Sequence, residues 1–171
     1  MEIIYFIFVS VMLLRIAYID FKEHYIYDLD IGIIAFVILA YNIYLSNWKC
    51  ACIGGVIGFV IGYVIYVASY YAYQEEAFGF GDVLLLGALG LLFGYPTFFH
   101  YFAITIMATG IVAAGFILWD SKYRKMELPM APVFVLGAIS FILLDYPCIE
   151  EAVYWIHYGI SIGFNVIMNL F

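Results

Sequence analysis

Seven long apolar stretches, separated by short polar breaks, constrain the fold of this chain more than any other feature. They lie near residues 2–19, 29–46, 50–73, 83–95, 97–119, 130–145 and 152–171. A helix of about 20 apolar residues spans the hydrocarbon core of a membrane. We therefore expect an all-α fold, a polytopic transmembrane helical bundle of six or seven helices. The last stretch forms either a seventh span or a helix at the membrane surface.

The composition agrees with a lipid environment. Hydrophobic residues make up 68% of the 171 residues and charged residues only 11%, whereas a soluble domain has roughly 25% charged residues. No linker or internal repeat divides the chain, so we expect a single integral-membrane domain over residues 1–171. The formal net charge of −7, with only six Lys and Arg residues, argues against nucleic acid as a partner and suits a basic peptide.

The distribution of basic residues predicts how the chain is oriented. Arg15 and Lys22 lie at the first break, and three more basic residues lie in the break at 120–129. Lys and Arg concentrate in the cytoplasmic loops of membrane proteins. We therefore expect the breaks at 20–28, 74–82 and 120–129 to share the cytoplasmic face, with the N-terminus outside.

Two aspartates at that face are the main candidates for chemistry. Asp20 ends the first apolar stretch, and Asp82 closes the run Gly79-Phe80-Gly81-Asp82. Ionisable residues next to a membrane span are costly and are functional candidates by default. Paired carboxylates suit an acid–base hydrolase, while Gly79 and Gly81 allow the backbone to bend and another segment to approach closely. Asp82 is also expected to be the N-cap of the fourth helix.

Two further aspartates compete for the role of the second carboxylate. Asp28 and Asp30 both lie just before the second apolar stretch. Aspartate is favoured at helix N-caps, so each has an alternative structural role as the cap of the second helix.

Small residues recur at helical spacing on two stretches, and we expect them to pack helices tightly rather than to take part in chemistry. They are Gly54, Gly58 and Gly62 on the third stretch, and Gly87, Ala88 and Gly90 on the fourth.

Three sequence elements together resemble the type IV prepilin peptidases. The run from Ala77 to Gly90 resembles the Gly-x-Gly-Asp signature of that family. Asp20, followed by Ile26 and Asp28, resembles its first aspartate box, an Asp with Ile-Pro-Asp downstream. The segment Leu128-Pro129-Met130-Ala131-Pro132 resembles a Pro-x-x-Pro-type start of a late helix. The three matches occur in order and cover most of the chain.

The chain also departs from the family pattern. Tyr27 stands where the family usually has proline, and Leu84 stands where lysine is common. The cysteine-rich loop of the larger bacterial members, which is linked to N-methylation, has no counterpart between the first two stretches. The chain therefore resembles the short, peptidase-only members, such as those that serve archaeal flagellin-like proteins or tight-adherence pili.

The resemblance implies an aspartic endopeptidase with Asp20 and Asp82 as its catalytic pair. Such an enzyme removes the short basic leader of pilin-like or archaeal flagellin-like precursors at the cytoplasmic face of the inner membrane. It uses no metal and no cofactor. Its expected partners are the precursor and the lipid bilayer, and self-association is left open. Three acidic residues on the same side, Glu23, Glu75 and Glu76, are expected either to attract the basic leader or to form a solvated loop face.

Two other functions remain open at the level of sequence. One is a Gly-x-Gly-Asp intramembrane protease of the presenilin or signal-peptide-peptidase kind, which cuts its substrate inside a membrane span. The other is a small proton-coupled transporter in which Asp20 and Asp82 relay protons.

Overall fold

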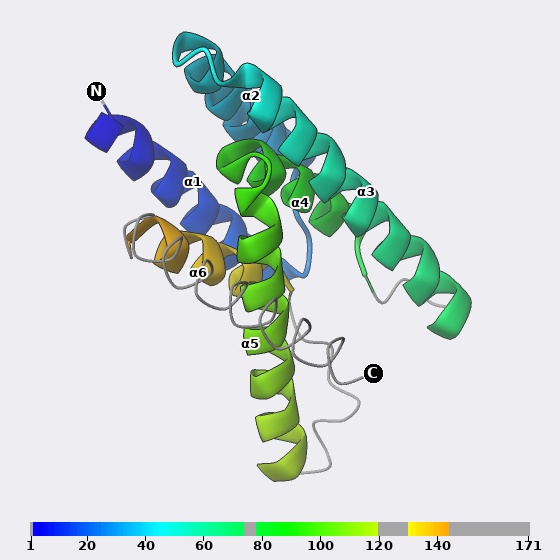
Figure 1. Ribbon diagram of the computed structural model, residues 1–171. Coiled ribbons are helices and arrows are strands. Elements are labelled where there is room, and N and C mark those ends of the chain that lie inside the picture. Colours follow the sequence, from blue (N-terminus) through cyan, green and yellow to red (C-terminus); the bar gives the residue numbers. More distant parts are fainter. Residues whose placement is uncertain (1, 74–77, 120–129, 144–171) are drawn as a thin grey trace, which may run out of the picture. The chain divides into compact units, whose positions relative to one another are not determined.

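The computed structural model describes residues 2–73, 78–119 and 130–143, and every regular element in these ranges is an α-helix (Figure 1). The helices are α1 (Glu2–Glu23), α2 (Asp28–Tyr44), α3 (Trp48–Tyr73), α4 (Phe80–Phe93), α5 (Thr97–Trp119) and α6 (Met130–Leu143). The described residues up to Ala138 belong to one compact unit, and Ile139–Leu143 of α6 belong to a second. The all-helical prediction is confirmed for the described part of the chain, whereas the predicted stretch 152–171 lies outside it.

Two of the described helices are long and apolar enough to cross a membrane, judged by length and composition. They comprise Ile3–Glu23 of α1 and Trp48–Tyr71 of α3, while α4, α6 and the first part of α5 are shorter apolar helices. Large apolar side chains such as Phe36 and Val56 lie exposed on the outer faces. Exposed apolar surface of this extent favours contact with lipid over contact with water.

The closest helix pair is α3 with α4, which lie side by side (Figure 1). Gly54 and Gly58 of α3 meet Gly90 and Leu86 of α4, and a Cβ atom on Gly58 would overlap the carbonyl oxygen of Leu86. Small residues let two helix backbones approach this closely. The prediction that these glycines pack helices is confirmed, and their packing fixes the position of α4.

A turn at Gly94-Tyr95-Pro96 joins α4 to α5. Gly94 has a φ of +65°, a left-handed conformation that glycine adopts readily. The N–H of Tyr95 donates to the carbonyl oxygen of Cys50 at 3.0 Å, which ties the turn to the start of α3.

The first part of α6 is held by α5. The fully buried Tyr101 of α5 donates its hydroxyl hydrogen to the carbonyl oxygen of Phe134 at 2.7 Å. A Cβ atom on Gly137 would meet the side chain of Thr105. These contacts place the beginning of α6 independently of α1, which matters for the site below.

Candidate active site

Asp20 lies in the last turn of α1, on its buried face. Val9, Leu13 and Ile16 are buried on this face and Asp20 continues it, because these positions follow each other at intervals of three or four residues. The helix ends after Glu23, where His24 adopts a φ of 51° and its N–H donates to the carbonyl oxygen of Asp20 at 2.9 Å. This left-handed cap holds Asp20 at the end of the helix.

Asp82 is buried in the first turn of α4, but it is not the N-cap. The N-cap is Gly79, in an extended conformation, and Asp82 is the third residue of the helix. The prediction of an Asp82 N-cap is therefore wrong by three positions. The physical reason is that an acidic side chain at this third position can reach back to the N-cap backbone, and the carboxyl group of Asp82 interacts with the backbone of Gly79 in this way.

The two carboxyl groups come together although they are far apart in sequence. Both side chains are less than one-tenth exposed, and Asp82 is close enough to feel the charge on Asp20. Oδ1 of Asp82 is buried and has no hydrogen-bond partner among the described residues. Two close, buried carboxyl groups cannot both ionise easily, so such a pair holds one proton between them. A pair of this kind can supply an acid and a base.

The loop between α1 and α2 packs on the glycine that precedes Asp82. Ile26 is buried, and a Cβ atom on Gly81 would lie 2.9 Å from the Cβ of Ile26. Gly79 is less crowded, since its Cβ would meet Oδ2 of Asp82 at 3.4 Å, an ordinary contact distance. Of the two glycines in the motif, only Gly81 is required for the close approach of the loop.

This chain has Tyr27 where the family pattern has proline, but the backbone at Tyr27 still adopts a conformation that proline could adopt. Tyr27 is the N-cap of α2 with a φ of −76°, within the range that a proline ring imposes. Asp28 and Asp30 are thus the first and third residues of α2, and the prediction that one of them caps the helix is wrong. The extended backbone that a cap requires falls one residue before Asp28.

The start of α6 supplies a third component of the site. The backbone N–H of Ala131, in the first turn of α6, donates to Oδ2 of Asp20 at 3.2 Å, across 111 positions of sequence. Leu128 and Pro129 of the same motif lie outside the described residues. The loop before α2 and the first turns of α4 and α6 thus each bring a residue to Asp20, to Asp82 or to the segment around them.

An ion pair between exposed Arg15 and buried Asp30 was missed by sequence reasoning. Asp30 is buried, and its Oδ1 accepts from Nη1 of Arg15 at 2.8 Å, while its Oδ2 is unpartnered among the described residues. The pair joins α1 to α2. An arginine inside an apolar helix needs a nearby acidic partner, and that signal was available in the sequence. Asp28 is exposed, so neither alternative aspartate shares the surroundings of Asp20.

The remaining predicted residues are less informative. Glu23 is exposed and accepts a hydrogen bond from the hydroxyl of Tyr27 at 3.1 Å, while Glu75 and Glu76 lie outside the described residues. Within the described ranges, no three acidic, histidine or cysteine side chains are grouped so as to hold a metal ion.

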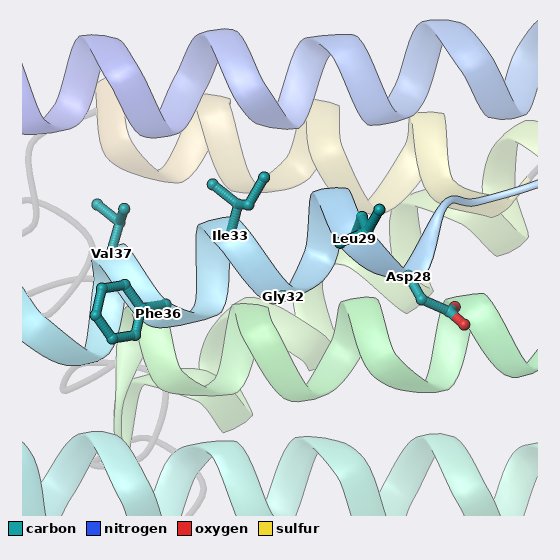
Figure 2. A pocket seen from close by; sticks show the side chains of 6 residues that line it. All are labelled: Asp28, Leu29, Gly32, Ile33, Phe36 and Val37. Carbon is teal, nitrogen blue, oxygen red and sulfur yellow. The ribbon is translucent and has the colours of Figure 1, made fainter.

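A shallow cavity of about 430 Å³ lies along the outer face of α2 (Figure 2). It is lined by Asp28, Leu29, Gly32, Ile33, Phe36 and Val37. Neither Asp20 nor Asp82 lines it, so the cavity is separate from the paired carboxyl groups.

Comparison with protein families gives one match: the model of the type IV leader peptidase family covers residues 7–118. The matched region contains both Asp20 and Asp82 and stops before α6. No curated protein and no solved structure matches the chain significantly.

Proposed function

Because the chain belongs to the type IV leader peptidase family, we propose that it is an aspartic endopeptidase with Asp20 and Asp82 as its catalytic pair. One observation carries the proposal: two buried carboxyl groups, delivered by α1 and α4, lie within electrostatic reach of each other. Both belong to the region that matches the family.

The mechanism follows from one proton shared by two carboxyl groups. The ionised carboxylate takes a proton from a water molecule, and the water oxygen attacks the scissile carbonyl carbon. The protonated partner donates a hydrogen bond to the carbonyl oxygen and later supplies the proton that the leaving amine needs. Oδ1 of Asp82, unpartnered among the described residues, is the acid oxygen that meets the substrate in this scheme.

We infer that the substrate is a pilin-like or flagellin-like precursor with a short basic leader, cut at the cytoplasmic face of the inner membrane. The family supports a precursor of this kind. The exposed carboxylate of Glu23 lies one turn from Asp20 and supports attraction of a basic leader, an effect that chiefly speeds encounter.

The test is to co-express the protein with a pilin-like precursor and to follow the size of the precursor. Asp20→Asn and Asp82→Asn should each abolish processing while the protein remains in the membrane, because each removes the shared proton or its acceptor. Asp28→Asn is the matched control: the residue is exposed, and its variant should process normally. Processing by either of the first two variants would overturn the proposal.

Mass spectrometry of the product distinguishes the alternatives. A new N-terminus at the end of the basic leader supports leader removal. A new N-terminus inside the apolar segment of the precursor would instead indicate an intramembrane protease, and proton flux without any cleavage would indicate a transporter.

A further inference from the structure

We propose that the backbone N–H of Ala131, in the first turn of α6, acts on the catalytic pair: it holds the Asp20 carboxylate in its ionised form, so that Asp20 is the base. The inference rests on the proposed function. It also gives a role to Ala131, which belongs to the motif at the start of α6 and which the catalytic pair alone leaves unexplained.

The first step is geometric. The hydrogen bond from Ala131 to Oδ2 of Asp20 is buried, and Ala131 itself is fully buried. The position of α6 is set by its contacts with α5, through Tyr101 and Thr105. The N–H is therefore presented to Asp20 by a separately anchored helix, and it fixes one carboxylate oxygen while the other stays available for water.

The second step is electrostatic. The N–H groups in the first turn of a helix have no acceptor within the helix, and they carry the positive end of the helix dipole. A hydrogen bond from such a donor to a carboxylate is charge-assisted and favours the ionised form. Among the described residues, the charged or titratable groups that act on Asp20 besides this donor are His24, just after α1, and Asp82, on α4.

The third step is the contrast with Asp82. It also lies in the first turn of a helix and interacts with the Gly79 backbone, but that contact is local. Its Oδ1 is buried without a partner among the described residues, and a buried charge without a partner is costly. The negative charge is therefore better placed on Asp20, and the shared proton on Asp82.

The experiment deletes the donor and keeps the helix. Ala131→Pro removes this N–H at a first-turn position, where proline is tolerated. We expect kcat for precursor cleavage to fall by about 10- to 100-fold, the loss of one hydrogen bond to a charged group, with KM nearly unchanged. The acidic limb of the pH profile should move to higher pH, because the Asp20 carboxylate loses a group that favours ionisation. A purely structural defect would not shift that limb.

Two matched variants complete the test. Met130→Pro places the ring one position earlier and keeps the Ala131 N–H, so its pH profile should remain that of the wild type. If Ala131→Pro does not reach the membrane, replacing Ala131 with lactic acid deletes the same N–H without a ring and should give the same shift. Wild-type kcat and pH profile in the donor-deleted protein, with Asp20→Asn still inactive, would overturn this inference and leave the proposed function standing. An inactive wild-type protein would instead reject the proposed function.

Discussion

Among single residues, Gly81 carries a steric constraint that Gly79 does not. A methyl group at Gly81 would lie 2.9 Å from the Cβ of Ile26, so the loop after Asp20 or the start of α4 must move. Overpacking of this kind costs about 1–3 kcal/mol. We expect Gly81→Ala to slow precursor cleavage strongly while its membrane abundance changes little. Gly79→Ala should cleave at a nearly normal rate, because its methyl group meets only an ordinary contact.

A second-site change tests whether Ile26 is the cause. The crowded atom is the Cβ of Ile26, which alanine retains and glycine lacks. Adding Ile26→Gly to Gly81→Ala should therefore restore part of the lost cleavage, and adding Ile26→Ala should restore less. Equal rates in the two double variants would show that the clash lies elsewhere.

At the scale of elements, the α3–α4 pair depends on glycines whose replacement is sterically forbidden. A Cβ on Gly90 would overlap the carbonyl oxygen of Gly54. Because this oxygen belongs to the backbone of α3, it cannot move aside as a flexible side chain could. We expect Gly90→Ala to lower the free energy of unfolding by about 1–3 kcal/mol, and to lower Tm in detergent by about 2–4 °C per kcal/mol. Gly110→Ala on α5 is the matched control, since nothing lies within 4 Å of its Cβ. That variant should leave Tm unchanged or raised, because alanine favours the helix by about 0.5–1 kcal/mol. Equal loss in both variants would contradict this account.

The elements themselves were largely predictable from sequence, and their ends were not. The apolar stretch 130–145 corresponds to α6, but the stretch 2–19 misses the last turn of α1, because Asp20, Lys22 and Glu23 are charged yet still helical. Hydropathy reports burial in an apolar medium and not hydrogen bonding, so it cannot locate the left-handed cap at His24. The same limit explains why the N-caps of α2 and α4 are Tyr27 and Gly79, and not the aspartates that were predicted to cap these helices.

The site was predictable only in part, for a related reason. Asp20 and Asp82 stand out because an isolated charge in an apolar sequence is rare. The contacts from Ala131 to Asp20 and from Arg15 to Asp30 depend on how distant helices pack. A pattern within one segment can indicate that Arg15 needs an acidic partner, but it does not identify which distant residue makes the contact.

At the scale of the whole molecule, helix order and length predict which ends share a membrane face. α2 is shorter than α1 and α3, but its 17 residues, at 1.5 Å per residue, make it about 26 Å long, at the lower limit of a helix that spans the hydrocarbon core. Its two ends should therefore reach opposite faces. We expect the loop at Tyr25, near Asp20, to lie in the cytoplasm, and the turn at Asn47 to lie outside.

Cysteine labelling in intact cells checks this orientation. Cys50, Cys52 and Cys148 are first replaced by serine, and Tyr25→Cys or Asn47→Cys is then introduced at an exposed position. A membrane-impermeant maleimide should label the Asn47→Cys protein from outside, and the Tyr25→Cys protein only after the cells are opened. Retained precursor cleavage in both variants verifies that they are folded. Labelling of both from outside would place the catalytic pair on the outer face, where a cytoplasmic basic leader cannot reach it, and would contradict the proposed site of cleavage.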